Sequence, residues 1–214
     1  MGRRLPANGN AFFQGERNNE KHIIIAGVPR AGKSTVSQMI SKIYGYQHIS
    51  MDSIIAGFEK AFPETGINSE AEGVPWQENL CKISSKIAPF LRAMMDSGEY
   101  DELDYGMVID IFQLLPGDYI KYIDTSVCDI YYFITSDVSP KERFELLKKY
   151  DTPKDYTFYK PDWENMDGCS DIVQASRFYR EQCIQYGLPY FETSKNRNAI
   201  LETFVKSFSW TAEN

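Results

Sequence analysis

The chain has few of the residues that build metal centres and disulfide frameworks. Its 214 residues include four cysteines and two histidines, and no two cysteines stand at the CxxC spacing of zinc sites. Cys128 and Cys183 lie in apolar surroundings and are predicted to be buried thiols. His22 and His48 flank predicted strands without nearby ligand partners, and we expect both to be structural.

Long apolar runs are missing as well. No stretch approaches the ~20 apolar residues of a membrane span, and no apolar segment follows Arg3 and Arg4, as a secretion signal requires. These absences argue against membrane and secreted proteins, and they favour a reducing cytoplasm.

Positive charge is also scarce. The chain has 23 Lys and Arg residues against 30 Asp and Glu residues, a net charge of −7. Because an acidic protein repels phosphate backbones, we expect no nucleic-acid partner. Hydrophobic residues make up 43% of the chain, which is ordinary for a globular protein, and the length suits one domain. We expect that domain to be a monomer or a homodimer.

Apolar segments along the chain alternate between strand and helix patterns. Residues 1–20 are polar and predict a disordered arm or a vector-derived remnant, while residues 21–214 form the single domain. Strands are expected at 23–26, 46–50, 106–111, 130–134 and 188–192, with helices at 34–44, 80–94, from 140 onward, 171–186 and 196–208. This alternation predicts an α/β fold with a parallel sheet and helices on both faces. Residues 151–168 lack periodicity and are typical of a lid or a binding loop.

The sequence GVPRAGKS, from Gly27 to Ser34, fits the P-loop pattern of Gly, four free positions and Gly-Lys-Ser. A predicted strand precedes it and a predicted helix follows it, which is the context that a working P-loop requires. The glycines let backbone N–H groups point at phosphate oxygens, and the helix adds the positive end of its dipole. Lys33 would contact the β- and γ-phosphates, and Ser34 would bind Mg²⁺. The alternative is a glycine-containing turn with no ligand.

Other polar residues are expected at the same edge of the sheet. Ligands of parallel α/β sheets bind beyond the carboxyl ends of the strands. Asp52, Asp110 and the loop 193–198 each follow a predicted strand, so they should lie near the P-loop. This convergence does not depend on the motif itself.

The P-loop, the five strand–helix alternations and the late polar segment resemble the adenylate-kinase-like P-loop kinases. That group includes nucleoside monophosphate kinases, shikimate and gluconate kinases, and chloramphenicol phosphotransferase. Val28-Pro29-Arg30 is similar to the GxPxxGK form of the loop in that group. The resemblance covers most of residues 22–208, although only the P-loop is specific. It implies a three-layer sandwich with a five-stranded sheet ordered 2-3-1-4-5, a lid at about 151–168, and Mg²⁺ and ATP as cofactors.

The resemblance also implies roles for two carboxylates. Asp52 sits where related kinases hold an acid near the acceptor hydroxyl, and it would orient or deprotonate that hydroxyl or hold Mg²⁺ through water. Its alternative is the N-cap of a helix. Asp110 has the place of a Walker-B acid that contacts Mg²⁺, and its alternative is a strand-end residue that opens a turn. Which of the two serves the metal stays open at this point.

Arginines and a base-binding loop are implied in the same way. Arg143 follows strand four, where kinases of this group carry arginines that neutralise charge on the transferred phosphoryl group. Arg177 and Arg180 are its rivals, and each could equally be a surface residue. Residues 193–197, with Asn196 and Arg197, are similar to the ETSAK loop of small GTPases and would border the nucleobase; a capped turn explains them equally. The residues expected to bind the nucleotide are therefore Asn196, Arg197, Gly27, Val28, Pro29, Arg30, Ala31, Gly32, Lys33, Ser34 and Thr35.

These features predict an ATP-dependent phosphotransferase that acts on a hydroxyl of a small-molecule acceptor. The alternatives are a P-loop ATPase or GTPase without kinase activity, a sulfotransferase and a nucleoside monophosphate kinase. The guanine-binding Asn-Lys-x-Asp motif is absent after strand four, where the sequence is Ile134-Thr135-Ser136-Asp137. Lys33-Ser34 favours a nucleoside triphosphate over the sulfate donor. The arginine that grips a nucleoside monophosphate is missing from residues 110–116, which argues against that acceptor.

Overall fold

A computed structural model describes residues 21–69, 71–97, 106–153 and 155–208. The predicted N-terminal arm, residues 1–20, lies outside these ranges. Five strands form one sheet: β1 (His22–Gly27), β2 (Gln47–Ser50), β3 (Met107–Ile111), β4 (Cys128–Ile134) and β5 (Tyr190–Glu192). All pairings are parallel and the order is β2-β3-β1-β4-β5. The predicted α/β class and strand order are both confirmed.

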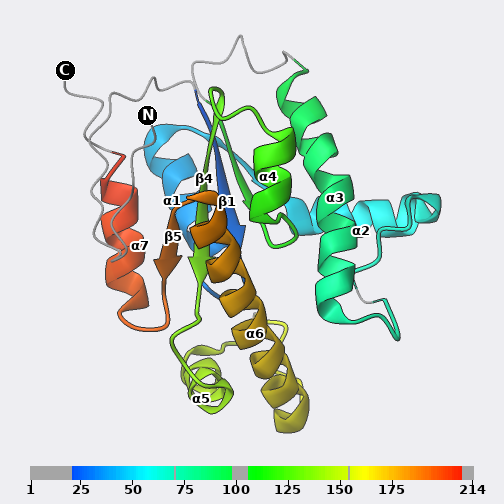
Figure 1. Cartoon of the computed structure of the whole chain (residues 1–214). Coiled ribbons are helices and arrows are strands. Elements are labelled where there is room, and N and C mark those ends of the chain that lie inside the picture. The colour runs from blue at the N-terminus through cyan, green and yellow to red at the C-terminus, as the bar shows by residue number, and fades with distance from the viewer. Residues whose placement is uncertain (1–20, 70, 98–105, 154, 209–214) are drawn as a thin grey trace.

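Helices cover both faces of this sheet, as a parallel sheet requires. α1 (Lys33–Tyr44) and α7 (Arg197–Lys206) pack together on one face, while α3 (Trp76–Met95), α4 (Pro116–Tyr122) and α6 (Asp162–Tyr186) cover the other (Figure 1). α2 (Met51–Ala61) and the short 3₁₀ helix η1 (Pro63–Thr65) follow β2. α5 (Pro140–Tyr150) and the first turns of α6 project beyond the carboxyl ends of the strands (Figure 1).

The core lies where the central strand is buried on both faces. Ile23, Ile24, Ile25 and Ala26 of β1 have at most 2% of their surface exposed, which explains why this strand is a continuous apolar run. Cys128 and Cys183 are buried free thiols, as predicted. None of the helices in the described part of the chain is long and apolar enough to cross a membrane.

The predicted irregular segment 151–168 needs a correction, because its last third is helical. α6 begins at Asp162, nine residues before the expected start at Asp171. Asp162 and Glu164 place negative charge in the first turn, where it interacts favourably with the helix dipole. Nδ2 of Asn165 also donates to the carbonyl oxygen of Thr157 at 2.9 Å. The irregular part is therefore residues 151–153 and 155–161, called the lid loop below.

Candidate functional site

The P-loop joins β1 to α1 at the carboxyl edge of the sheet, and its backbone requires glycine at two positions. Gly27 has φ +117° and Gly32 has φ +110°. A Cβ at Gly27 would lie 2.1 Å from the carbonyl oxygen of Phe133 on β4, and one at Gly32 would lie 2.7 Å from Cδ1 of Leu201 on α7. Both glycines therefore combine a left-handed backbone with close packing against neighbouring elements. The N-terminus of the 12-residue α1 points out of this loop, as an anion-binding site needs.

Lys33, the first residue of α1, is held inside the curve of the P-loop. Its Nζ donates to the carbonyl oxygen of Val28 at 2.9 Å, and only 8% of the residue is exposed. Burial lowers the pKa of Lys33 to about 8, while the nearby carboxylates of Asp52 and Asp110 act in the opposite direction. A phosphate group would supply the negative charge that this buried ammonium lacks.

Asp110 is the penultimate residue of β3 and lies beside the P-loop, next to Ser34. Its side chain is 1% exposed. Oδ1 accepts hydrogen bonds from the hydroxyls of Ser34 at 3.5 Å and Ser50 at 3.4 Å, and Oδ2 lies 2.5 Å from Nε2 of His48. The expectation that His48 is only structural did not foresee this contact. One sequence signal for this contact was present. His48 and Ser50 are two residues apart on β2, so their side chains point to the same face of the sheet, and β2 pairs with β3.

These oxygens fit a hard cation such as Mg²⁺. Within the described residues, no cluster of three or more His, Cys, Asp or Glu side chains could hold a metal alone. Mg²⁺ is commonly bound by one or two carboxylates together with substrate phosphates and water, so a complete protein cage is not needed. The Ser34 hydroxyl and the Asp110 carboxylate form such a partial set.

Asp52 lies in the first turn of α2, and Ser50 is the N-cap residue. The alternative that Asp52 caps this helix is therefore wrong. The residue is exposed, yet neighbouring atoms still withdraw its carboxyl group from water and raise its pKa. Lys33 opposes this shift and Asp110 adds to it, which places the three charged groups near one another. A carboxylate with a raised pKa beside the phosphate site suits a general base.

Arg143 extends from the first turn of α5 to the P-loop. The capping box of Ser139 and Glu142 fixes the start of this helix. Arg143 is 7% exposed, its Nη2 donates to the carbonyl oxygen of Pro29 at 3.0 Å, and its Nε has no partner among the described residues. Burial lowers its pKa. A buried guanidinium without a carboxylate partner is costly and calls for an anion.

The rival arginines lie elsewhere. Arg177 is exposed on α6, and no hydrogen bond or ion pair joins it to the described residues of the P-loop. Arg180 forms an ion pair with Asp137 at 2.9 Å and lies over the ring of Tyr190. Of the three arginines, only Arg143 contacts the P-loop.

The loop after β5 is held firmly at its start. The N–H of Thr193 donates to the carbonyl oxygen of Ile134 at 2.8 Å, so the loops after β4 and β5 lie side by side. Asn196 takes a left-handed backbone at φ +53° and precedes α7, without capping it through its side chain. Nη2 of Arg197 donates to Oγ1 of Thr35 at 3.4 Å. Asn196 and Arg197 thus lie on the side of the P-loop that α7 covers, and their contact with a nucleobase stays a prediction.

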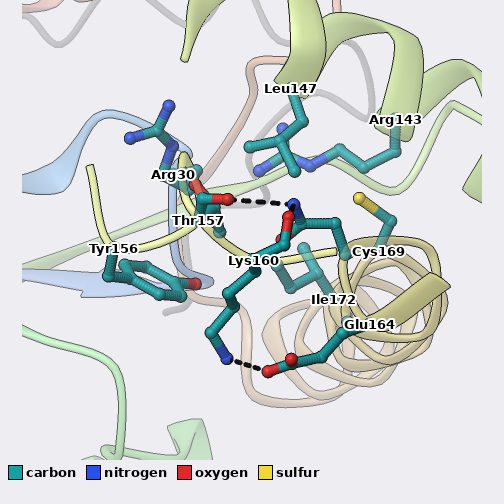
Figure 2. Close-up of a pocket in the computed structure, with 11 residues that line it drawn as sticks. Arg30, Arg143, Leu147, Tyr156, Thr157, Lys160, Glu164, Cys169 and Ile172 are labelled. Carbon is teal, nitrogen blue, oxygen red and sulfur yellow. Dashed lines mark hydrogen bonds and ion pairs between the residues drawn. The ribbon is translucent and has the colours of Figure 1, made fainter. Parts of the chain in front are cut away.

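A pocket opens between α5, the lid loop and α6, with about 380 Å³ of space that is partly open to solvent. Arg30 and Arg143 lie at one side of it, and Tyr156, Lys160 and Cys169 are among the other residues that line it (Figure 2). The positive side chains at its inner end lie next to the P-loop, where phosphates are expected.

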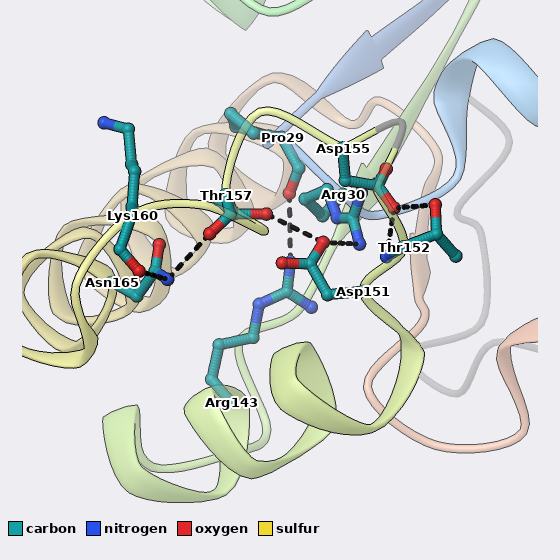
Figure 3. Close-up of polar contacts among 9 residues, drawn as sticks. All are labelled: Pro29, Arg30, Arg143, Asp151, Thr152, Asp155, Thr157, Lys160 and Asn165. Carbon is teal, nitrogen blue, oxygen red and sulfur yellow. Dashed lines mark hydrogen bonds and ion pairs between the residues drawn. The ribbon is translucent and has the colours of Figure 1, made fainter.

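Sequence reasoning missed the direct connection between the P-loop and the lid loop. The guanidinium of Arg30 forms ion pairs with Asp151 and Asp155, and the first of these measures 2.9 Å (Figure 3). The spacing of these residues does not predict the contact, because more than 120 residues separate the partners in the sequence. The only sequence signal was the pair of aspartates, Asp151 and Asp155, at the start of the segment that was expected to form a lid.

Comparison with known proteins defines the fold. No family profile matches the sequence, and no curated protein matches it. Among solved structures, the chain is similar to a sugar kinase from a Janibacter species, with a TM-score of 0.53 and 14% identity over 90% of this chain and 96% of the other. It is also similar to shikimate kinase from Bacteroides thetaiotaomicron, with a TM-score of 0.50 and 17% identity over 88% and 98%. The chain has the fold of the adenylate-kinase-like P-loop kinases, as the sequence resemblance implied.

Proposed function

We propose that the protein is an ATP-dependent phosphotransferase that moves the γ-phosphoryl group of Mg-ATP to a hydroxyl of a small-molecule acceptor. The observation that carries this proposal is the pairing of two buried cations on one P-loop. Lys33 and Arg143 are 8% and 7% exposed, and they donate to the successive carbonyl oxygens of Val28 and Pro29. Two buried positive charges beside the N-terminus of α1 favour a polyphosphate ligand.

In this proposal the residues divide the transfer step among them. The acceptor oxygen bonds to the γ-phosphorus, the bond from that phosphorus to the β–γ bridging oxygen breaks, and ADP leaves. The acceptor proton passes to the carboxylate of Asp52, whose raised pKa favours its uptake. Lys33 and Arg143 stabilise the charge on the phosphoryl oxygens, and the P-loop N–H groups hold the β-phosphate.

Asp110 and Ser34 would hold Mg²⁺ in this arrangement, and Asp52 would act as the base. The burial of Asp110 and its contact with Ser34 support this division of roles. The metal would neutralise phosphate charge and orient the β- and γ-oxygens. Asn196 and Arg197 would border the nucleobase, and we expect the reaction to take place in the cytoplasm, where the four free thiols would stay reduced.

A fold that other kinases share does not identify the acceptor. A thermal-shift and phosphorylation screen of metabolites, nucleosides and antibiotics with Mg-ATP would find it. The proposal expects stabilisation by ATP and acceptor-dependent formation of ADP. Stabilisation by GTP and not by ATP would overturn the donor, and ADP formation that no acceptor accelerates would favour a P-loop ATPase.

The variant Lys33→Ala tests the mechanism once an acceptor is known. Removal of a buried phosphate-binding ammonium should lower kcat/KM by at least a hundredfold. Lys42→Ala is the matched control, because Lys42 is an exposed lysine of the same helix. Equal turnover by Lys33→Ala and Lys42→Ala would show that the proposed mechanism is wrong.

A further inference from the structure

Arg30 occupies a position in the P-loop whose backbone suits glycine. Its φ is +64°, and among the described residues only Arg30 and Asn196 are non-glycine residues with positive φ. A side chain in the left-handed region costs free energy that glycine does not. Strain of this kind persists where surrounding contacts hold it, and such sites are often functional. The contacts of Arg30 should therefore show what its side chain is for.

The guanidinium of Arg30 bridges two carboxylates of the lid loop (Figure 3). Nη2 donates to Oδ1 of Asp151 at 2.9 Å, and Nη1 donates to Oδ1 of Asp155. Both acids are themselves fixed within the loop. Asp151, with 8% of its side chain exposed, also accepts from Oγ1 of Thr157 at 2.8 Å, and Oδ2 of Asp155 accepts from the N–H and the hydroxyl of Thr152 at 2.8 Å. One P-loop side chain thus holds a folded segment of the lid.

The same contact fixes the far end of the helix that carries Arg143. Asp151 is the C-cap residue of α5, and its N–H donates to the carbonyl oxygen of Leu147 at 2.8 Å. Arg143 lies in the first turn of α5 and donates to the carbonyl oxygen of Pro29, the neighbour of Arg30. Helix α5 is therefore attached to the P-loop at both ends, through arginines that extend in opposite directions (Figure 3).

We propose that Arg30 is a positioning residue that holds the lid loop on the P-loop through Asp151 and Asp155, and so places Arg143 beside the phosphates. The inference rests on the proposed function, in which Arg143 stabilises the transferred phosphoryl group. Arg30 gives its own guanidinium to carboxylates, whereas the unpartnered Nε of Arg143 leaves that residue able to bind an anion. The two arginines therefore have different roles although both lie at the P-loop.

The kinetic test uses Arg30→Gly, because glycine keeps the left-handed P-loop backbone and removes only the side chain. At saturating Mg-ATP and acceptor, kcat should fall by about tenfold to a hundredfold, as for a misplaced catalytic group, while the KM for nucleotide changes less. Asp151→Asn combined with Asp155→Asn should reproduce this loss, and Arg30→Lys should recover part of it. Lys148→Ala is the matched control, because it breaks the exposed Lys148–Asp162 ion pair of the same region and should leave kcat unchanged.

A double variant decides whether Arg30 acts through Arg143. If it does, Arg30→Gly combined with Arg143→Ala should be no slower than Arg143→Ala alone. Rate losses that multiply would overturn the proposal, because they would show an independent effect of Arg30. A raised KM with unchanged kcat would overturn it too, since Arg30 would then serve only nucleotide binding.

Hydrogen exchange of the nucleotide-free full chain tests the docking without any turnover. Amides of residues 151, 152 and 155–160 should exchange at least tenfold faster in Arg30→Gly than in the parent. Asp151→Asn/Asp155→Asn should show the same increase as Arg30→Gly, and the combination of all three changes should add nothing to it. Unchanged exchange in Arg30→Gly would overturn the proposal. The proposed function fails separately, if Lys33→Ala retains full transfer while this exchange pattern still holds.

Discussion

Nε2 of His48 lies 2.5 Å from Oδ2 of Asp110, and this contact joins neighbouring strands at the edge of the sheet where phosphates are expected. Asp110 is almost completely buried, and its other oxygen faces the hydroxyl of Ser34. His48 therefore fixes the orientation of the carboxylate that is proposed to serve Mg²⁺. Partners of this kind hold the ligand in place and strengthen metal binding.

The variant His48→Ala should weaken Mg²⁺-dependent binding of ATP by about tenfold or more, because residues that orient a metal ligand commonly have effects of that size. Titration of Mg²⁺ at fixed ATP, followed by calorimetry, measures the change. Gln47→Ala is the control, since Gln47 is the exposed neighbour on β2. Equal Mg²⁺ requirements in the two variants would contradict the role given to His48.

Asp52 and Asp110 should separate in their effects on turnover. Asp52→Asn removes the proposed base and should lower kcat by about 10²–10⁴-fold with little change in nucleotide affinity, whereas Asp110→Asn should raise the Mg²⁺ concentration needed for binding. Because neighbouring atoms withdraw the carboxyl group of Asp52 from water and raise its pKa, activity should be lost on acidification at a higher pH than for an ordinary aspartate. Steady-state kinetics across pH and Mg²⁺ concentration measure both effects. The assignment would be contradicted if Asp110→Asn lowered kcat at saturating Mg²⁺ and Asp52→Asn raised the Mg²⁺ concentration needed for binding.

Lys33 should make the stability of the protein depend on pH above neutrality. Its pKa is about 8 in the folded chain, below the 10.5 of an exposed lysine. Between these values the unfolded chain binds more protons, so the free energy of unfolding rises with pH, by at most about 3 kcal/mol. Lys33→Met should therefore be more stable than the parent at pH 7 and lose that advantage by pH 10. Urea unfolding at several pH values measures the difference, and a constant difference would contradict the lowered pKa.

Two glycines should respond to alanine in opposite directions. In Gly27→Ala the new Cβ would meet the Phe133 carbonyl oxygen at 2.1 Å, so the backbone must shift, and the loss of stability should be about 2–4 kcal/mol. Gly57 lies within α2, where a Cβ meets nothing within 4 Å, and Gly57→Ala should stabilise the helix by about 0.5–1 kcal/mol. Thermal unfolding compares them, and similar melting temperatures would refute the close approach of β1 to β4.

Much of this architecture could be predicted from sequence because its signals are local. The buried run of β1 and the spacing from Gly27 to Ser34 each involve residues that are close together in the sequence. The positions of Asp52 and Asp110 followed from a general property of parallel sheets, that carboxyl ends of strands meet at one edge.

The contacts that sequence missed depend on tertiary placement. Arg30 meets Asp151 only because α5 folds back over the P-loop, and His48 meets Asp110 only because β2 pairs with β3. The start of α6 at Asp162 was not predicted, because the first turns of this helix project beyond the sheet and bury few apolar side chains (Figure 1). Periodicity reports burial, so a projecting helix gives a weak pattern.

Glu192, the last residue of β5, offers a test of the proposed base-binding loop. Its Oε2 accepts from the N–H and the hydroxyl of Ser136, both at 2.7 Å, and its Oε1 accepts from the N–H of Ser194 at 3.0 Å and from the Ser194 hydroxyl. One carboxylate thus holds together the loops that follow β4 and β5. In Glu192→Gln the amide group can satisfy only one of these donor pairs, and the 193–198 loop should lose its fixed position.

Glu192→Gln should weaken ATP binding by about tenfold, since hydrogen bonds to charged groups contribute about 1.5–3 kcal/mol each and part of that loss is recovered by water. Binding of inorganic tripolyphosphate should be unchanged, because the P-loop itself is untouched. Calorimetry with both ligands separates the base from the phosphates, and Glu202→Gln, an exposed change on α7, is the matched control. If tripolyphosphate binding fell as much as ATP binding, Glu192 would be supporting the P-loop, and the 193–198 loop would lose its proposed contact with the nucleobase.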